Sequence, residues 1–411
     1  MSESFSYAPL LYEGLPPPAT RWTSSPPFNF TGGNNDADQV PVAGLVAAAS
    51  AVLTREGHTL ATYGLASGPQ GYRPLREFLA TKLKRDAGIS CQDGDILITS
   101  GSMQALDLVN GVLLARGDTV IVEQETYGGA LTRLARLGIN PIGIPLDREG
   151  MRMDALAAAL DDLKHRRIRP KYIYTIPTVQ NPTGAIMGEQ RRQQLLRLSK
   201  GHGVPIIEDD CYADLIWEGR RPPAIRALSR HGGVIYIGSF SKSIAPALRV
   251  GYIVADWEVL SRMLAIKNDA GSGALEQMVL AEYCSEHFSE HVQKLTRGLR
   301  VKLDTLVNAL AESFGTSAEF DTPKGGIFLW VKLPDTVETR KLAQSALAHG
   351  VAINPGPEWS TDGANAKARM RLCFGSPSGD EIRLGIATLA EVCRRQFGLP
   401  TSIANVTIGD S

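Results

Sequence analysis

Short apolar runs alternate with amphipathic stretches along most of the chain from about residue 45. The apolar runs are rich in β-branched residues, which is typical of buried strands, and they cover residues 95–100, 119–124, 139–146, 171–177, 204–209 and 233–239. The stretches between them have the apolar spacing of helices, over residues 102–116, 129–138, 153–166 and 188–203. Buried strands separated by such helices predict an α/β domain with a mostly parallel sheet between two layers of helices.

The pattern changes after residue 256, where a long helical stretch runs to about residue 313. Shorter strands are expected beyond it, over residues 317–323, 326–333, 351–356 and 369–375, with helices over 339–350 and 380–396. This order predicts a second, smaller α+β domain. The first forty residues are rich in Pro, Gly, Ser and Asn and predict an irregular arm. We therefore expect an arm over residues 1–44 that packs on the small domain and the substrate site, a large domain over 45–300 and a small domain over 301–411.

Composition and charge narrow the class of protein. Of the 411 residues, 43% are hydrophobic and 21% are charged, which is typical of a globular protein. Lys plus Arg and Asp plus Glu both number 43, and this zero net charge argues against nucleic acid or a membrane surface as a partner. The cysteines form no Cys-x-x-Cys pair, and no signal-peptide pattern or long apolar run is present. We expect a cytoplasmic protein with reduced thiols.

Polar side chains collect where the strands of the large domain are expected to end. In an open parallel sheet the carboxyl ends of the strands lie along one edge, and ligands bind there. The residues near these ends are Ser102, Met103, Gln104, Tyr127, Asn181, Asp209, Tyr212, Ser239, Ser241, Lys242 and Arg249. They combine an amine, a carboxylate, a carboxamide and phenols with a helix N-terminus and an arginine, which suit a phosphate.

One ligand matches this set of groups, pyridoxal 5′-phosphate (PLP). The Lys242 amine can form a Schiff base with the PLP aldehyde, and a carboxylate such as Asp209 can keep the ring nitrogen protonated. Asn and Tyr side chains can hold the ring hydroxyl, and an aromatic side chain can stack on the ring. The phosphate suits the free N–H groups where a helix begins near residue 102, together with hydroxyl groups and the planar guanidinium of Arg249.

The motifs that carry these residues resemble those of fold-type I PLP-dependent enzymes of the class I/II aminotransferase family, nearest the 2-aminoadipate/kynurenine and MocR-type branch. The resemblance covers about residues 30–395 and rests on GPQGYRPLREFLA, ITSGSMQALDLV, PTVQNPTG, IIEDDCY, GSFSKSIAPALRVGYIVA, PKGGIFLWV and RLCFG, in this order. It implies an aminotransferase that moves an amino group between an L-amino acid and a 2-oxo acid, by way of a Lys242 aldimine and a quinonoid. It also implies a homodimer with shared active sites.

The resemblance gives the residues around the PLP ring their roles. Lys242 would form the Schiff base and shuttle the proton, and Asp209 would pair with the ring nitrogen. Tyr127 would stack on the ring and take part in catalysis, while Asn181 and Tyr212 would hold the ring hydroxyl.

The resemblance also places residues around the phosphate and the substrate. Those around the phosphate are Ser102, Met103, Gln104, Ser239 and Arg249. Tyr63 would reach the phosphate of the neighbouring subunit. Arg371 would bind the substrate α-carboxylate in a bidentate pair, with Asn181 beside it and Gly33 of the arm facing the substrate.

The chain departs from the family's pattern at three places. Met103 stands where family members commonly carry glutamine, so its phosphate contact would come from the backbone. The segment around Tyr63 is longer than usual, which puts its phosphate contact in question. The pair Gly32-Gly33 continues into Asn34-Asn35-Asp36, where most relatives have a Pro-containing stretch, and we expect an altered substrate-facing arm.

Two other functions stay open at this point. A lyase, decarboxylase or cyclase acting on an amino acid would use the same site, and the altered arm is compatible with that. A PLP-sensing regulator of MocR type would need an N-terminal DNA-binding domain, for which the Pro-rich arm is too short.

Three further patterns are interpreted as structural. The segment His287–His291, HFSEH, has the spacing of a zinc site without a third ligand, and we expect no metal. The glycine-rich segments GGNND and GSGAL lack the flanking strand and helix of a dinucleotide site. Asp210 is expected to have a structural role. No second arginine clearly indicates a dicarboxylate substrate, so the substrate's side chain is left open.

Overall fold

The structure of the chain is a computed structural model that describes residues 5–12, 15, 18–19, 21, 24–269 and 271–399. The described part contains a seven-stranded sheet with the order β2-β10-β9-β8-β7-β3-β4. Its strands are β2 (Ile96–Thr99), β3 (Thr119–Glu123), β4 (Asn140–Ile144), β7 (Ile173–Thr175), β8 (Ile206–Asp209), β9 (Val234–Ser239) and β10 (Gly251–Val254). Within it, β10 runs antiparallel to both neighbours, and the other pairs are parallel.

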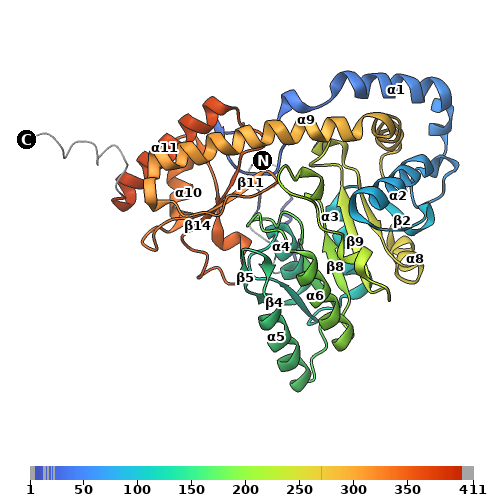
Figure 1. Ribbon diagram of the computed structural model, residues 1–411, viewed down its shortest axis with the longest axis horizontal. Helices are drawn as coiled ribbons and strands as arrows, with labels where there is room; N and C mark the ends of the chain where they lie inside the picture. Colours follow the sequence, from blue (N-terminus) through green and yellow to red (C-terminus); the bar gives the residue numbers. More distant parts are fainter. Residues whose placement is uncertain are drawn as a thin grey trace, which may run out of the picture.

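Helices cover both faces of this sheet, because its central strands are buried and apolar on both sides. One face packs against α3 (Ser102–Leu113), α4 (Gly128–Leu137) and α8 (Trp257–Ile266). The other packs against α2 (Arg73–Ala87), α5 (Met153–His165), α6 (Glu189–His202) and α7 (Ile225–Leu228). The predicted α/β class with a mostly parallel sheet between helical layers is confirmed (Figure 1).

A 41-residue helix, α9 (Ala274–Phe314), runs along the upper edge of the molecule in Figure 1. It packs with α1 (Val42–Glu56) and α2 on one side and with α11 (Gly379–Phe397) on the other. The sequence predicted one helical stretch over residues 256–313, but α8 and α9 are separate helices. Gly271 and Gly273 lie between them, and Gly271 has a φ of 110°, which favours glycine. The expected domain boundary at residue 300 lies within α9.

A smaller antiparallel sheet consists of β11 (Phe328–Lys332), β14 (Arg369–Cys373) and β13 (Asn354–Pro355), in that order. Its core includes side chains of α10 (Thr339–Ala348) and α11. In the arm, β1 (Phe28–Asn29) pairs in parallel with β12 (Val351–Ala352), which fixes the arm to the C-terminal part of the chain. The strand expected over residues 317–323 is only an isolated bridge between Glu319 and Lys332. Pro323 ends that segment and has no N–H to extend the pairing.

The remaining elements are short. They are β5 (Leu146–Asp147), β6 (Gly150–Met151) and the 3₁₀ helices Ala8–Leu10, Ala37–Gln39, Gly57–Ala61, Tyr63–Ala66, Asp93–Asp95, Ala213–Leu215, Pro246–Leu248, Gly315–Ser317 and Gly356–Trp359. Across the described residues, every helix is too short or too polar to cross a membrane.

Candidate active site

A cavity of about 590 Å³ lies at the carboxyl edge of the seven-stranded sheet, between that edge, the small sheet and the arm. Residues predicted for the site make up much of its lining: Gly33, Ser102, Met103, Tyr127, Asn181, Asp209, Tyr212, Ser239, Lys242, Arg249 and Arg371. These side chains come from strands and loops that are far apart in the sequence, and the fold brings them to one place.

Lys242 follows the end of β9, and its side chain is held inside the cavity. Its Nζ donates a hydrogen bond of 2.6 Å to the carbonyl oxygen of Gly33 in the arm. A Cβ on Gly33 would lie 2.7 Å from this Nζ, so a side chain at this position would displace the amine from its present place. Burial lowers the pKa of Lys242 below its ordinary value. A lower pKa favours the neutral amine, which can act as a nucleophile and a base.

Asp209 ends β8, and one of its two carboxylate oxygens has a partner. The Tyr174 hydroxyl, from the neighbouring β7, donates a 2.7 Å hydrogen bond to Oδ2. The other oxygen, Oδ1, is buried and has no hydrogen-bond partner among the described residues. Burial raises the pKa of Asp209, whereas the hydrogen bonds from Tyr174 and Cys211 act in the opposite direction. Asp210 faces elsewhere and forms a 2.7 Å ion pair with Arg221, in agreement with a structural role.

Asn181 lies between Tyr212 and Arg371 and contacts both. Its Nδ2 donates to the Tyr212 hydroxyl at 3.2 Å, and its Oδ1 accepts from Arg371 Nη1 at 3.2 Å. The peptide bond to Pro182 is cis. Asn181 therefore links the part of the cavity next to β8 with the part formed by the small sheet.

The start of α3 and the Arg249 turn form a cradle of backbone and polar groups. Gly101 precedes α3 with a φ of 80°, and no side chain caps the helix that begins at Ser102. Its first N–H groups therefore lack intrahelical partners and suit an anion. A Cβ on Gly251 would lie 2.7 Å from the Ser102 nitrogen, so the backbones pack closely here. Arg249 donates to the Ser100 carbonyl oxygen at 3.1 Å, and Ser239 Oγ accepts from the Ser241 N–H at 3.0 Å.

Tyr127 precedes α4 and lies over the cavity beside Met103. Its hydroxyl contacts the Met103 sulfur at 3.0 Å, and its ring lies 6.1 Å from the Trp359 ring, measured between centroids. Burial raises the pKa of Tyr127, so the phenol stays neutral at physiological pH. The ring is placed to pack against a flat ligand.

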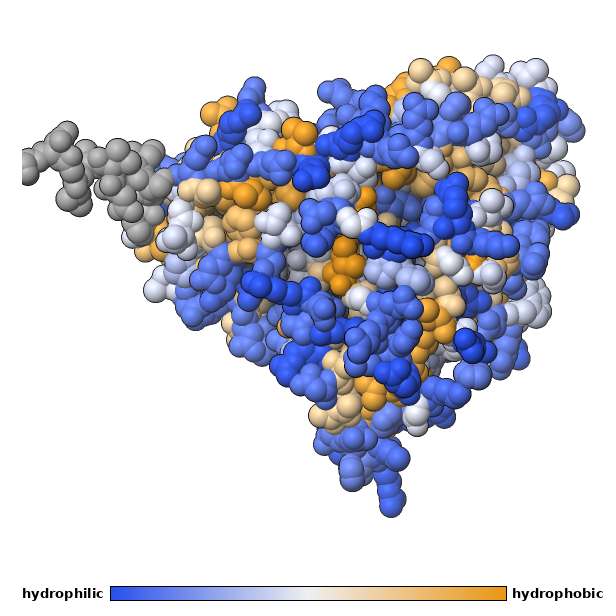
Figure 2. Space-filling model, in the orientation of Figure 1, coloured by the Kyte–Doolittle hydropathy of each residue, from blue (hydrophilic) through white to orange (hydrophobic). Residues whose placement is uncertain are grey.

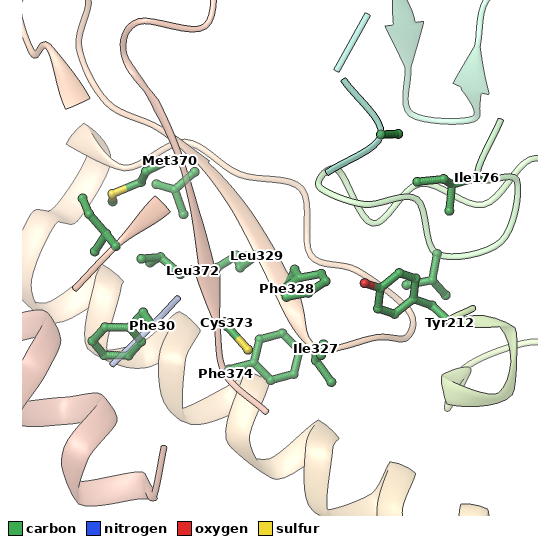
Figure 3. Packing of buried hydrophobic residues seen from close by; sticks show 14 of the residues in the cluster. Phe30, Ile176, Tyr212, Ile327, Phe328, Leu329, Met370, Leu372, Cys373 and Phe374 are labelled. Atoms are coloured by element: carbon green, nitrogen blue, oxygen red, sulfur yellow. The ribbon is translucent and has the colours of Figure 1, made fainter. Parts of the chain in front are cut away.

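Arg371 on β14 is held between two aromatic rings. Its guanidinium carbon lies 3.8 Å from the centroid of the Phe328 ring and 3.7 Å from that of Trp359. Figure 3 shows Phe328 next to Tyr212, and these two rings meet edge to face at 5.5 Å. Nη2 of Arg371 donates to the Gly32 carbonyl oxygen at 2.6 Å. Nε is buried without a partner in the described part of the chain, and burial lowers the pKa of this group to about 10.

Two predicted residues lie outside this cavity. Gln104 accepts from the Ser100 N–H at 2.7 Å and donates to Asp269 at 2.6 Å, so its side chain is engaged next to the cavity lining. Tyr63 is 89% exposed and lines a separate cavity with Lys267.

The zinc-like segment has a structural contact instead of a metal ligand set. His291 donates to the Ser243 carbonyl oxygen at 2.8 Å. Within the described residues, no group of three His, Cys, Asp or Glu side chains is placed to hold a metal ion.

Sequence reasoning missed Gly32, Tyr174, Cys211 and Trp359, all of which contact or line the site. Cys211 could have been found, because it lies between Asp209 and Tyr212 in the IIEDDCY motif. Gly32 could also have been found, because it lies in the segment GGNND, where the chain departs from the family's pattern. Tyr174 and Trp359 carry no motif that links them to the site.

PLP fits the groups that this cavity leaves free. The lone Oδ1 of Asp209 suits a protonated ring nitrogen, and the free N–H groups at the start of α3 suit a phosphate. The unpartnered Nε of Arg371 suits a carboxylate. The fold and the cavity together place the protein among the PLP-dependent enzymes of fold type I.

A family model described as aminotransferase class I and II matches residues 25–388, and the chain belongs to this family. The chain is 33% identical over 373 residues to aromatic-amino-acid aminotransferase 1 of Thermococcus litoralis, covering 90% of this chain and 88% of that protein. The kynurenine aminotransferase of Pyrococcus horikoshii, solved in complex with PMP, aligns with a TM-score of 0.85 at 34% identity, over 91% of this chain and 92% of that one. The predicted family, PLP cofactor and aminotransferase activity are confirmed.

A regulator is also among the relatives. The HTH-type transcriptional regulator YdfD of Bacillus subtilis is 37% identical over 325 residues, which cover 78% of this chain and 65% of the regulator. The predicted MocR-type side of the branch is therefore present among the similar proteins.

Proposed function

We propose that this aminotransferase uses Lys242, Asp209 and Arg371 as its principal active-site residues, in the transfer of an amino group between an L-amino acid and a 2-oxo acid. The observation that carries the proposal is that one cavity contains a half-buried amine, a buried carboxylate oxygen without a partner and a buried guanidinium nitrogen without a partner among the described residues. These groups match an aldehyde, a ring nitrogen and a substrate carboxylate.

Bound PLP would supply a reactive aldehyde and an electron-withdrawing ring. Asp209 Oδ1 would accept the hydrogen bond of the protonated ring nitrogen, while Tyr174 fixes Oδ2. Asn181 and Tyr212 would hold the ring hydroxyl, and Tyr127 would pack on the ring. The phosphate would be held by the N–H groups at the start of α3, including that of Met103, and by the side chains of Ser102, Ser239 and Arg249.

Lys242 would bind the cofactor and then move the substrate proton. Its Nζ takes the proton from the substrate Cα, which requires the neutral amine favoured by the lowered pKa. Arg371 would fix the substrate by its α-carboxylate, using Nε and an N–H of Nη2 as a fork. Gly33 and Asn181 form the wall beside it. This anchoring would hold Cα near the lysine through the reaction.

A homodimer with shared active sites is part of the proposal. The nearly fully exposed Tyr63 supports it, because a tyrosine of this kind can serve a neighbouring subunit. Val42 and Val46 expose an apolar face of α1, and Figure 2 shows apolar residues at the upper right, where α1 lies. The proposal also includes the predicted arm over residues 1–44, the large domain over 45–300 and the small domain over 301–411. Five free cysteines support a cytoplasmic location. Light scattering after size exclusion tests the dimer.

A screen of amino acids in single-turnover reactions tests the function. The PLP-loaded chain is mixed with each amino acid, and the 2-oxo acid and pyridoxamine phosphate are measured by mass spectrometry. For a substrate, we expect the two products to form in equal amounts. Return of the cofactor to PLP with 2-oxoglutarate or pyruvate completes the transfer. Release of carbon dioxide, ammonia or a cyclic product without pyridoxamine phosphate would instead identify a decarboxylase, lyase or cyclase. Binding of promoter DNA without any turnover would identify a regulator.

A further inference from the structure

The unusual segment Asn34-Asn35-Asp36 ties the arm to the core of the molecule. The Asp36 carboxylate forms a 2.7 Å ion pair with Lys302 of α9, and the two side chains are 19% and 13% exposed. Lys302 Nζ also donates to the carbonyl oxygens of Gly375 and Ser376, at 3.2 and 3.4 Å. Those two residues follow β14, the strand that carries Arg371. One ammonium group therefore connects the arm to the end of that strand.

Asn35 holds the arm from its other side. Its Nδ2 donates to the carbonyl oxygens of Lys242 and Ile244, at 3.2 and 3.4 Å. The backbone also packs closely here, because a Cβ on Gly375 would lie 2.7 Å from the Asn34 carbonyl oxygen. The arm is thus fixed to the Lys242 loop, to α9 and to the segment after β14.

This anchoring places the Gly32 carbonyl oxygen on Arg371. Gly32 accepts from Nη2 and Asn181 accepts from Nη1, while Phe328 and Trp359 cover the two faces of the guanidinium. An arginine has five N–H donors, so these two bonds leave three of them, one each on Nε, Nη1 and Nη2, and those on Nε and Nη2 can bind a carboxylate as a fork. The Gly32 carbonyl therefore orients the guanidinium without taking all of its donors.

We propose that Asp36 and Lys302 form a positioning pair that sets the affinity for the substrate carboxylate, by holding Gly32 against Arg371. The inference rests on the proposed role of Arg371. Without the ion pair the arm is held by Asn35 and by backbone contacts, and Gly32 no longer fixes one orientation of the guanidinium. Substrate binding weakens, whereas the groups proposed to hold the ring and the phosphate lie outside the arm and keep their places.

The first test measures the arm itself and requires no substrate. Hydrogen exchange of the peptide over residues 28–40 is followed by mass spectrometry in the PLP-loaded wild type, Asp36→Asn and Lys302→Met. We expect faster exchange in both variants and slower exchange again in the charge-swapped double variant Asp36→Lys/Lys302→Asp. Asp38→Asn, an exposed carboxylate two residues away, and Lys294→Met, an exposed lysine on α9, are the matched controls.

The second test uses the amino acid that the wild type converts best. Because partly exposed ion pairs contribute modestly, KM should rise about fivefold in both single variants, with a much smaller change in kcat and an unchanged visible spectrum of bound PLP. The charge swap should recover part of the loss. If Asp36→Asn and Lys302→Met keep the KM of the wild type, the pairing role is refuted. The proposed transamination by the wild type would not be affected by that result. A wild type that transaminates nothing would refute the proposed function, and the exchange result would still report on the anchor.

Discussion

The two halves of the active site are built in different ways. The cofactor half, with Asp209, Lys242 and Asn181, comes from the ends of neighbouring strands of one sheet. The substrate half joins Gly32 of the arm to Arg371 of β14, 339 residues away in the sequence. The first half follows β7, β8 and β9, whose residues are all buried and paired in backbone ladders, whereas the second half depends on the packing of separate elements.

Because the two halves are built differently, substitutions in them should change different kinetic parameters. Tyr174 and Ile207 are paired in register on β7 and β8, so the ladder itself brings the Tyr174 hydroxyl next to Asp209. In the substrate half, single contacts such as the Gly32 carbonyl oxygen and the Phe328 ring decide how the guanidinium lies. We therefore expect changes in the cofactor half to affect the chemical step, and changes in the substrate half to affect KM.

The largest effect is expected from Lys242→Ala in the cofactor half. It removes the amine that binds PLP and moves the proton, and turnover should fall about 10⁴-fold. After borohydride reduction, mass spectrometry should find PLP attached covalently to the wild type and not to the variant. Lys200→Ala, on the exposed face of α6, is the control and should keep both properties. Covalent PLP in Lys242→Ala would show that another residue is the reacting amine.

Arg371→Lys is the next largest change and acts on the substrate half. It keeps the positive charge but loses the planar fork, together with the contacts to Gly32 and Asn181. We expect kcat/KM to fall about 100-fold, mainly through KM, as for a buried charge pair that loses one partner. Arg369→Lys, two residues away on β14, lines a different cavity and should behave as the wild type. A loss confined to kcat would contradict the carboxylate-binding role.

The same contrast explains how much could be predicted from the sequence. Each cofactor residue follows a recognisable apolar run, so the sheet edge and most of this half of the site were predictable. Gln104 was predicted next to the phosphate but lies outside the cavity, because it is two positions beyond Ser102 in α3 and two helical steps of about 100° turn it toward Asp269. Gly32 and Trp359 meet Arg371 through tertiary packing that no local pattern encodes.

Tyr174→Phe gives a smaller effect, with a pH signature. The Tyr174 hydrogen bond lowers the pKa of Asp209, which burial raises. Its loss raises that pKa further, so the carboxylate ionises only at higher pH and activity is lost sooner on acidification. The acid limb of kcat/KM should therefore move to higher pH. Tyr172→Phe is the matched control, because Tyr172 is also buried but donates to Asn110. An equal shift in both variants would indicate a general loss of packing.

The smallest effect is expected from Phe328→Leu, which removes one of the two rings that cover Arg371. An arginine over an aromatic ring contributes about 0.5–1 kcal/mol, so KM should rise by about threefold. The same substitution in an Arg371→Lys background should change KM less, because the fork that the ring orients is already gone. Phe374→Leu in the neighbouring core is the control and should lower stability without changing KM. If Phe328→Leu changes KM by the same factor in both backgrounds, Phe328 does not act through Arg371. It would then act through its edge-to-face contact with Tyr212 in the cofactor half, and this residue would belong to both halves of the site.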